Sequence, residues 1–178
     1  MSQTEKRRRF TTEEKTAYHE AGHAVIRISL PGLSRNTKVT IVPKGDALGY
    51  TKHRCIPSDH QSHDPLPSPS MMGKRINQII SLLAGGIAEK RLTKRYNSTG
   101  AKSDRETAIN YACDACGPFG DSELLLQWLW ARTSDIVERH WDLIDAVAQA
   151  LLKDRTLTGD QVGEVMRKAP CPYRSHKA

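Results

Sequence analysis

The chain has 178 residues and a formal net charge of +7, from 27 lysines and arginines against 20 aspartates and glutamates. Its 38% hydrophobic and 26% charged residues are typical of a globular protein with one buried core. No apolar run approaches the roughly 20 residues that a membrane-spanning helix needs, and the first ten residues lack the apolar stretch of a secretory signal. We therefore expect a single-domain cytoplasmic protein.

A basic run opens the sequence and is followed by the region that we expect to fold. The basic run consists of Lys6, Arg7, Arg8 and Arg9. Such a run can bind nucleic acid or an anionic membrane surface, but it is more often a solvated tail, and no nucleic-acid-binding motif accompanies it. We predict a disordered tail over residues 1–10, one domain over 11–168 and a second tail over 169–178, with neither nucleic acid nor a membrane as partner.

The first predicted helix starts near residue 11. Thr11 and Glu14 have the spacing of a capping box, which satisfies two backbone donors at a helix start, and Pro31 with Gly32 ends the segment. Small and apolar residues recur at helical spacing and would form one buried stripe: Ala17, Ala21, Ala24, Val25 and Ile28.

This helix carries the sequence His19-Glu20-Ala21-Gly22-His23, an H-E-x-x-H motif. Two histidines four residues apart lie on one face of a helix, so both imidazoles can reach a single metal ion. Glu20 projects beside that ion without binding it, where it can take a proton from the attacking water. The alternative is a surface helix that carries two histidines by chance, and the rarity of the pattern argues against it.

A small β region and a long helix follow. Residues 38–42 alternate like a strand, 43–47 form a turn, and 48–51 can return as a second strand. Residues 54–70 form an irregular loop, so His60 and His63 lie on no regular element and do not predict a second metal site. A helix is expected over 71–94, where the interior pair Gly85 and Gly86 indicates that another backbone packs closely.

The remaining sequence is helical. Ser103 and Glu106 predict a second capping box, which places Asp104 in the first turn of the next helix. Helices over 122–152, broken near His140, and over 158–167 complete the chain, with Trp128, Trp130 and Trp141 as core or helix-packing residues. The predicted fold is mostly α, a single-domain helical bundle with a small β-hairpin or sheet beside the H-E-x-x-H helix.

The four cysteines give a weak signal. Cys113 and Cys116 have the spacing of a metal or redox pair, but no second pair with matching spacing accompanies them. We interpret them as two reduced, half-buried residues of a helix.

A catalytic zinc normally has a third protein ligand, and the sequence leaves two candidates. The metzincin pattern is excluded, because Ile26 and Ser29 stand where it requires glycine and histidine. No glutamate occurs between Glu20 and Glu89, so Glu89 is one candidate and Asp104 is the other.

Several segments carry a specific pattern in a fixed order: residues 18–25 (YHEAGHAV), 38–45 (KVTIVPKG), 47–51 (ALGYT), 83–89 (LAGGIAE), 98–104 (STGAKSD), 120–123 (GDSE) and 148–160. They resemble the peptidase domain of the FtsH family, which consists of membrane-bound AAA+ zinc proteases. The similarity extends over about residues 11–168.

The resemblance implies a zinc metallopeptidase with one Zn²⁺ per chain and polypeptide substrates. His19, His23 and Asp104 would be the zinc ligands, Glu20 the general base, and Glu89 a residue that orients a ligand histidine. The family works as hexamers, which implies a homo-oligomer. The sequence contains no phosphate-binding G-x-x-x-x-G-K-[ST] motif and no membrane helix, so we expect a free-standing, ATP-independent peptidase domain that a separate ATPase can supply with substrate.

The alternative is a catalytically idle peptidase-fold protein that serves as a binding or assembly partner, possibly of that ATPase. The presence of His19, Glu20, His23 and Asp104 together argues against it.

Overall fold

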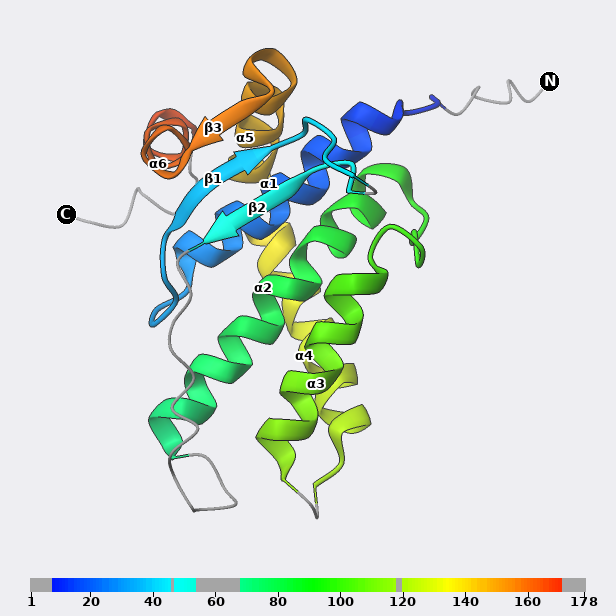
Figure 1. Ribbon diagram of the computed structural model, residues 1–178, viewed down its shortest axis with the longest axis vertical. Coiled ribbons are helices and arrows are strands. Elements are labelled where there is room, and N and C mark those ends of the chain that lie inside the picture. The colour runs from blue at the N-terminus through cyan, green and yellow to red at the C-terminus, as the bar shows by residue number, and fades with distance from the viewer. Residues whose placement is uncertain (1–7, 46, 54–67, 118–119, 171–178) are drawn as a thin grey trace.

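The computed structural model describes residues 8–45, 47–53, 68–117 and 120–170. This part of the chain contains six helices and a three-stranded sheet (Figure 1), which confirms the predicted mostly α class. The elements are α1 (Thr12–Ser29), β1 (Asn36–Thr40), β2 (Tyr50–His53), α2 (Pro69–Thr93), α3 (Lys102–Cys116), α4 (Ser122–Arg139), α5 (Trp141–Asp154), β3 (Thr156–Thr158) and α6 (Gly159–Lys168). Most of the predicted terminal tails, and the predicted loop with His60 and His63, lie outside the described residues.

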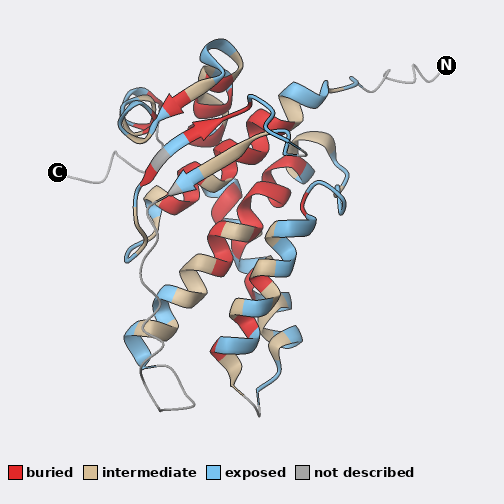
Figure 2. Ribbon diagram, in the orientation of Figure 1, coloured by how far each residue is buried: buried red, intermediate tan, exposed pale blue. Residues whose placement is uncertain are grey.

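Helix α1 lies at the centre of the molecule. The predicted capping box is present: the Thr11 side chain accepts a hydrogen bond from the Glu14 backbone N–H, and the Glu14 carboxylate accepts one from the Thr11 backbone. The helix packs against α2, α5 and β1, and nearly all its residues from Thr16 to Arg27 are buried (Figure 2). The sheet, α5 and α6 lie towards one end of the molecule, and α2, α3 and α4 extend towards the other (Figure 1).

The contact between α1 and α2 is unusually close at Gly22. A Cβ atom at this position would lie 2.7 Å from the Ala84 carbonyl oxygen and 2.9 Å from the Ala88 Cβ. The close backbone approach therefore occurs at Gly22, and not at the Gly85–Gly86 pair as the sequence predicted. Gly85 faces histidine side chains, and Gly86 faces Tyr96 and Ala101.

The sheet is antiparallel with the strand order β2-β1-β3. Val39 of β1 is fully buried and pairs with Thr51 on one side and Leu157 on the other. The two predicted strands are confirmed with bounds shifted by about two residues. The third strand was not predicted, because three residues are too short to display an alternating pattern. Among the residues that the structure describes, strand β2 lies at an edge of the sheet.

The start of α3 corrects another prediction. The helix begins at Lys102 after an N-cap at Ala101, with no side-chain cap hydrogen bond, so the predicted capping box of Ser103 and Glu106 is wrong. Ala101 is 3% exposed and packs against Gly86, so its burial fixes where the helix begins. Asp104 lies in the first turn, as predicted.

The tryptophans differ in their packing. Trp130 contacts the Tyr96 ring edge-to-face, and Trp141 stacks on Tyr18. Trp128 is 57% exposed, so its prediction as a core or helix-packing residue is wrong. The buried face of α4 is formed by Leu129, Thr133, Ile136 and Val137.

The predicted break near His140 is confirmed, because α4 ends at Arg139 and α5 begins at Trp141. Cys113 and Cys116 lie in the last turns of α3 and are free thiols. Cys116 is half-buried as predicted, but Cys113 is exposed, so the prediction is wrong for its burial. Among the helices that the structure describes, none has both the length and the apolar composition needed to cross a lipid bilayer.

We predict that Gly22→Ala destabilises the fold by about 1–3 kcal/mol, because the added methyl group must displace the backbone of α2. Gly73→Ala, on the exposed surface of α2, has nothing within 4 Å of the added Cβ and should stabilise the protein by about 0.5–1 kcal/mol. Urea unfolding at one fixed zinc concentration measures both changes. Equal effects of the two substitutions would contradict the close approach at Gly22.

Candidate metal centre

The two histidines of the H-E-x-x-H motif meet at one point. His19 and His23 lie one turn apart on α1, and their Nε2 atoms are 3.1 Å from each other. Their rings are arranged edge-to-face with centroids 4.7 Å apart. The helical spacing therefore brings both imidazoles to a common site, as the sequence indicated.

Asp104 reaches the same point from α3. Its Oδ2 lies 3.1 Å from the Nε2 atom of each histidine. The His19, His23 and Asp104 ligand atoms all lie within 4.8 Å of one another, and the three residues form the one such group that the described residues contain. The Asp104 side chain is 29% exposed, against 11% and 12% for the histidines, so the group is most open towards α3.

Two residues of helix α2 lie at the other ring nitrogen, Nδ1, of the two histidines. The His23 Nδ1 donates a hydrogen bond to the Ser81 carbonyl oxygen at 2.8 Å. The His19 Nδ1 lies 3.6 Å from the Glu89 Oε2, and the Asn97 side-chain amide donates to the other Glu89 oxygen at 3.1 Å. A partner that binds Nδ1 turns Nε2 towards the centre and raises its basicity, an arrangement typical of metal-ligating histidines.

The carboxylates favour positive charge at the rings. Burial works against the charged form of His19, but Asp104 and Glu89 outweigh it and raise the pKa of His19 to about 10. Burial likewise opposes the charged form of His23, yet Asp104 raises the pKa of this ring too. Partial burial opposes ionisation of Asp104, but His23 and His19 lower the pKa of its carboxyl group. The centre therefore stabilises a cation between these side chains.

Gly85 leaves space at the point where the ring nitrogens meet. A Cβ atom on Gly85 would lie 2.4 Å from the His23 Nε2 and 2.8 Å from the His19 Nε2. Only glycine keeps this space free of protein atoms. The site offers two imidazole nitrogens and one carboxylate oxygen around a space that a Cβ atom would fill. This donor set and this space fit a divalent metal ion such as zinc.

Glu20 follows His19 on α1 and is 6% exposed, and its charge acts to raise the pKa of both histidines. Its Oε2 accepts a hydrogen bond from the Thr51 hydroxyl of β2 at 2.8 Å. Sequence reasoning did not identify Thr51 or the Ser81 carbonyl, because residues 31 and 58 positions away from their partners give no local signal. Glu89, one of the two third-ligand candidates, faces the Nδ1 side of His19, opposite the point where Asp104 lies.

Residues 6–129 match the family described as Peptidase family M41, a segment that includes His19, Glu20, His23 and Asp104 and ends within α4. None of α5, β3 and α6 lies within the matched residues.

Curated relatives carry the name ATP-dependent zinc metalloprotease FtsH. The chain is 30% identical over 185 residues to such a protein of Oryza sativa subsp. japonica, named FTSH 9, chloroplastic/mitochondrial, and this match covers 89% of the chain and 22% of the relative. It is 29% identical over 199 residues to one of Caldicellulosiruptor bescii (88% and 31% covered) and 40% identical over 124 residues to one of Pirellula staleyi (67% and 16% covered).

The chain thus spans less than a third of the length of each of these relatives. The family match extends over most of the chain and includes the helix and the aspartate that build the centre. This protein belongs to peptidase family M41.

Proposed function

We propose that this chain is a zinc-dependent metalloendopeptidase that hydrolyses peptide bonds of flexible or unfolded polypeptides and needs no ATP for this on its own chain. The observation that carries the proposal is the convergence of the His19 and His23 Nε2 atoms and the Asp104 Oδ2, with the Glu20 carboxylate beside them. A homo-oligomer, a separate ATPase partner and a cytoplasmic location stay predictions.

In this proposal, His19, His23 and Asp104 hold one zinc ion per chain. When bound, zinc supplies Lewis acidity that polarises a carbonyl group and makes a water molecule more acidic. Glu20 acts as the general base: its carboxylate takes the proton of the attacking water and passes it to the leaving amine. The Thr51 hydroxyl orients the Glu20 carboxylate for both transfers.

The backbone of the substrate can pair with the edge strand β2 as an additional strand. This strand pairs with β1 on one side, and its Thr51 contacts Glu20. An extended polypeptide added to the other side of β2 would pass next to the general base. Chains already extended or unfolded meet this requirement without being unfolded first.

We predict that Glu20→Gln abolishes cleavage while zinc binding is retained, since the amide keeps the shape of the side chain but cannot accept a proton. The rate should fall by at least a factor of about 10²–10⁴. Cleavage of casein, assayed with and without ATP, and zinc content by elemental analysis measure the two properties. Glu106→Gln, on the exposed surface of α3, is the matched control and should cleave like wild type.

Equal cleavage by wild type and Glu20→Gln would contradict the proposed base. A wild-type protein that binds zinc but cleaves no unfolded protein would favour the idle binding partner instead.

We predict that Asp104→Ala removes most of the bound zinc, whereas Glu89→Ala weakens zinc binding only by about 10–100-fold, because Glu89 acts through His19. Competition with a chelator measures both affinities, and Glu106→Ala is the control on α3. A greater loss in Glu89→Ala than in Asp104→Ala would reverse the assignment of the ligand.

We predict that Gly85→Ala also lowers zinc affinity, because its methyl group enters the space at the two Nε2 atoms, whose rings Ser81 and Glu89 hold in place. Gly73→Ala, on the same helix, should bind zinc like wild type. Circular dichroism separates loss of metal from loss of helix. Unchanged affinity in Gly85→Ala would show that the metal lies elsewhere.

A further inference from the structure

Residues 94–101 join the helix that orients His19 to the helix that carries Asp104. On the α2 side, the Glu89 carboxylate faces the His19 Nδ1 at 3.6 Å. On the α3 side, Asp104 lies in the first turn and reaches the Nε2 atoms of both histidines. This segment therefore lies between two residues that bear on the candidate metal centre.

The side chain of Asn97 ties this segment to α2. Its amide nitrogen donates a hydrogen bond to the Glu89 Oε1 at 3.1 Å, and its carbonyl oxygen accepts one from the Gly100 backbone N–H at 3.0 Å. The bond to Gly100 is a local contact that asparagine commonly makes in turns. The bond to Glu89 joins residues eight positions apart and ends on a residue that is 5% exposed, so turn formation does not account for it.

Gly100 leaves room for this arrangement. A Cβ atom at Gly100 would lie 2.5 Å from the Asn97 Nδ2 and 3.1 Å from the Asn97 Cγ. The nitrogen that such a Cβ would displace is the one that donates to Glu89. The absence of a side chain at Gly100 thus allows Asn97 to reach Glu89.

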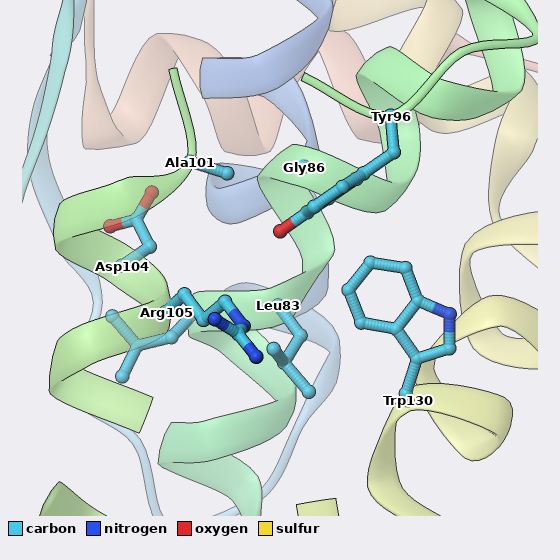
Figure 3. A pocket seen from close by; sticks show the side chains of 8 residues that line it. Leu83, Gly86, Tyr96, Ala101, Asp104, Arg105 and Trp130 are labelled. Atoms are coloured by element: carbon cyan, nitrogen blue, oxygen red, sulfur yellow. The ribbon is translucent and has the colours of Figure 1, made fainter. Parts of the chain in front are cut away.

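The residues on either side of Asn97 pack against α2 (Figure 3). The Tyr96 ring and the Ala101 side chain both lie at Gly86, where an added Cβ would be 3.2 Å from the ring and 3.1 Å from the Ala101 Cβ. Tyr96 also contacts Trp130 edge-to-face, with ring centroids 5.0 Å apart. Because this packing already orders the backbone, the Asn97 side chain loses little further conformational freedom when it forms its two hydrogen bonds.

We propose that Asn97 is a positioning residue of the candidate metal centre, which holds the Glu89 carboxylate in the orientation that faces the His19 Nδ1. This inference rests on the zinc site of the proposed function. A carboxylate that is held at one oxygen presents its other oxygen in a fixed direction, here towards His19. The hydrogen bond that holds it is of the stronger kind, because its acceptor is ionised.

Asparagine suits this position because its side-chain amide donates and accepts at the same time. Aspartate would lack the donor and would place a second carboxylate beside Glu89. Serine can accept from the Gly100 N–H but is too short to reach Glu89 as well. Asn97 is itself exposed, so its replacement removes these hydrogen bonds without leaving a cavity in the core.

The test compares the zinc affinities of full-length variants by competition with a chelator. We expect Asn97→Ala and Asn97→Ser each to lower the affinity by about tenfold, at the lower end of the effect expected for Glu89→Ala. In the Glu89→Ala background, Asn97→Ala should cause no further loss, because the group that it positions is gone. The matched control is Asn77→Ala, which removes a 3.0 Å hydrogen bond from an asparagine of α2 to the Pro31 carbonyl and should bind zinc like wild type.

Gly100→Ala tests the same contact from its other side. The added methyl group should displace the Asn97 amide and lower zinc affinity by a similar factor in the wild-type background. In Asn97→Ala, where the displaced atoms are absent, the same substitution should have little effect. An equal effect of Gly100→Ala in both backgrounds would contradict the contact.

Cobalt(II) bound in place of zinc distinguishes an effect on ligand geometry from an effect on folding. Its visible absorption bands depend on the arrangement of the ligands, so metal-saturated Asn97→Ala and Glu89→Ala should show the same altered spectrum, and Asn77→Ala the wild-type spectrum. Wild-type affinity in Asn97→Ala or Asn97→Ser, a wild-type cobalt spectrum in Asn97→Ala, or additive losses in the double variant would overturn the inference.

These measurements need no cleavage, so the inference and the proposed function can fail separately. A protein that binds zinc and shows these losses but cleaves no polypeptide would refute the hydrolase proposal and leave the role of Asn97 intact. A zinc-dependent peptidase whose zinc affinity is unchanged in Asn97→Ala would exclude the positioning role alone. A wild-type protein that binds neither zinc nor cobalt would overturn both.

Discussion

The geometry of the candidate metal centre depends on the close packing of α1 against α2. The Ser81 carbonyl and the Glu89 carboxylate are eight residues apart on α2, and they face the Nδ1 atoms of His23 and His19. Between them, Gly85 leaves free the space where the two Nε2 atoms meet. These contacts require that α1 lie directly on the backbone of α2, and Gly22 permits this. A side chain at Gly22 would move the histidines away from the groups that orient them.

Two other elements complete the centre from different directions. Helix α3 brings the Asp104 carboxylate to both ring nitrogens, and the edge strand β2 brings the Thr51 hydroxyl to Glu20. Each functional side chain thus lies on a helix or strand whose position is fixed by the core. Such support keeps the proposed ligands and the proposed base in one geometry, which metal binding and proton transfer both need. The side towards α3 is the more open one, because Asp104 is more exposed than either histidine.

Of two capping boxes that the sequence predicts from the same spacing, one forms in the structure and the other does not. Thr11 and Glu14 form theirs at an exposed helix start, where Arg8 also pairs with the Glu14 carboxylate. Ser103 and Glu106 do not, because buried Ala101 packs against Gly86 and starts the helix earlier. Trp128 gives the same lesson: its residue type favours burial, but the face of α4 that meets the core is set by the neighbouring helices. Local patterns hold only where tertiary packing does not oppose them.

The sequence alone determined that one helix presents two histidines and a glutamate in metallopeptidase spacing, because a helix repeats every 3.6 residues and so fixes which side chains share a face. It also determined the mostly α class and the break near His140. Only the tertiary structure decided that Asp104 meets the Nε2 atoms while Glu89 lies behind His19, and that Ser81 and Thr51 orient the rings and the glutamate. These contacts join residues 31 to 85 positions apart, and their geometry follows from how the helices and the sheet pack, which no local pattern encodes.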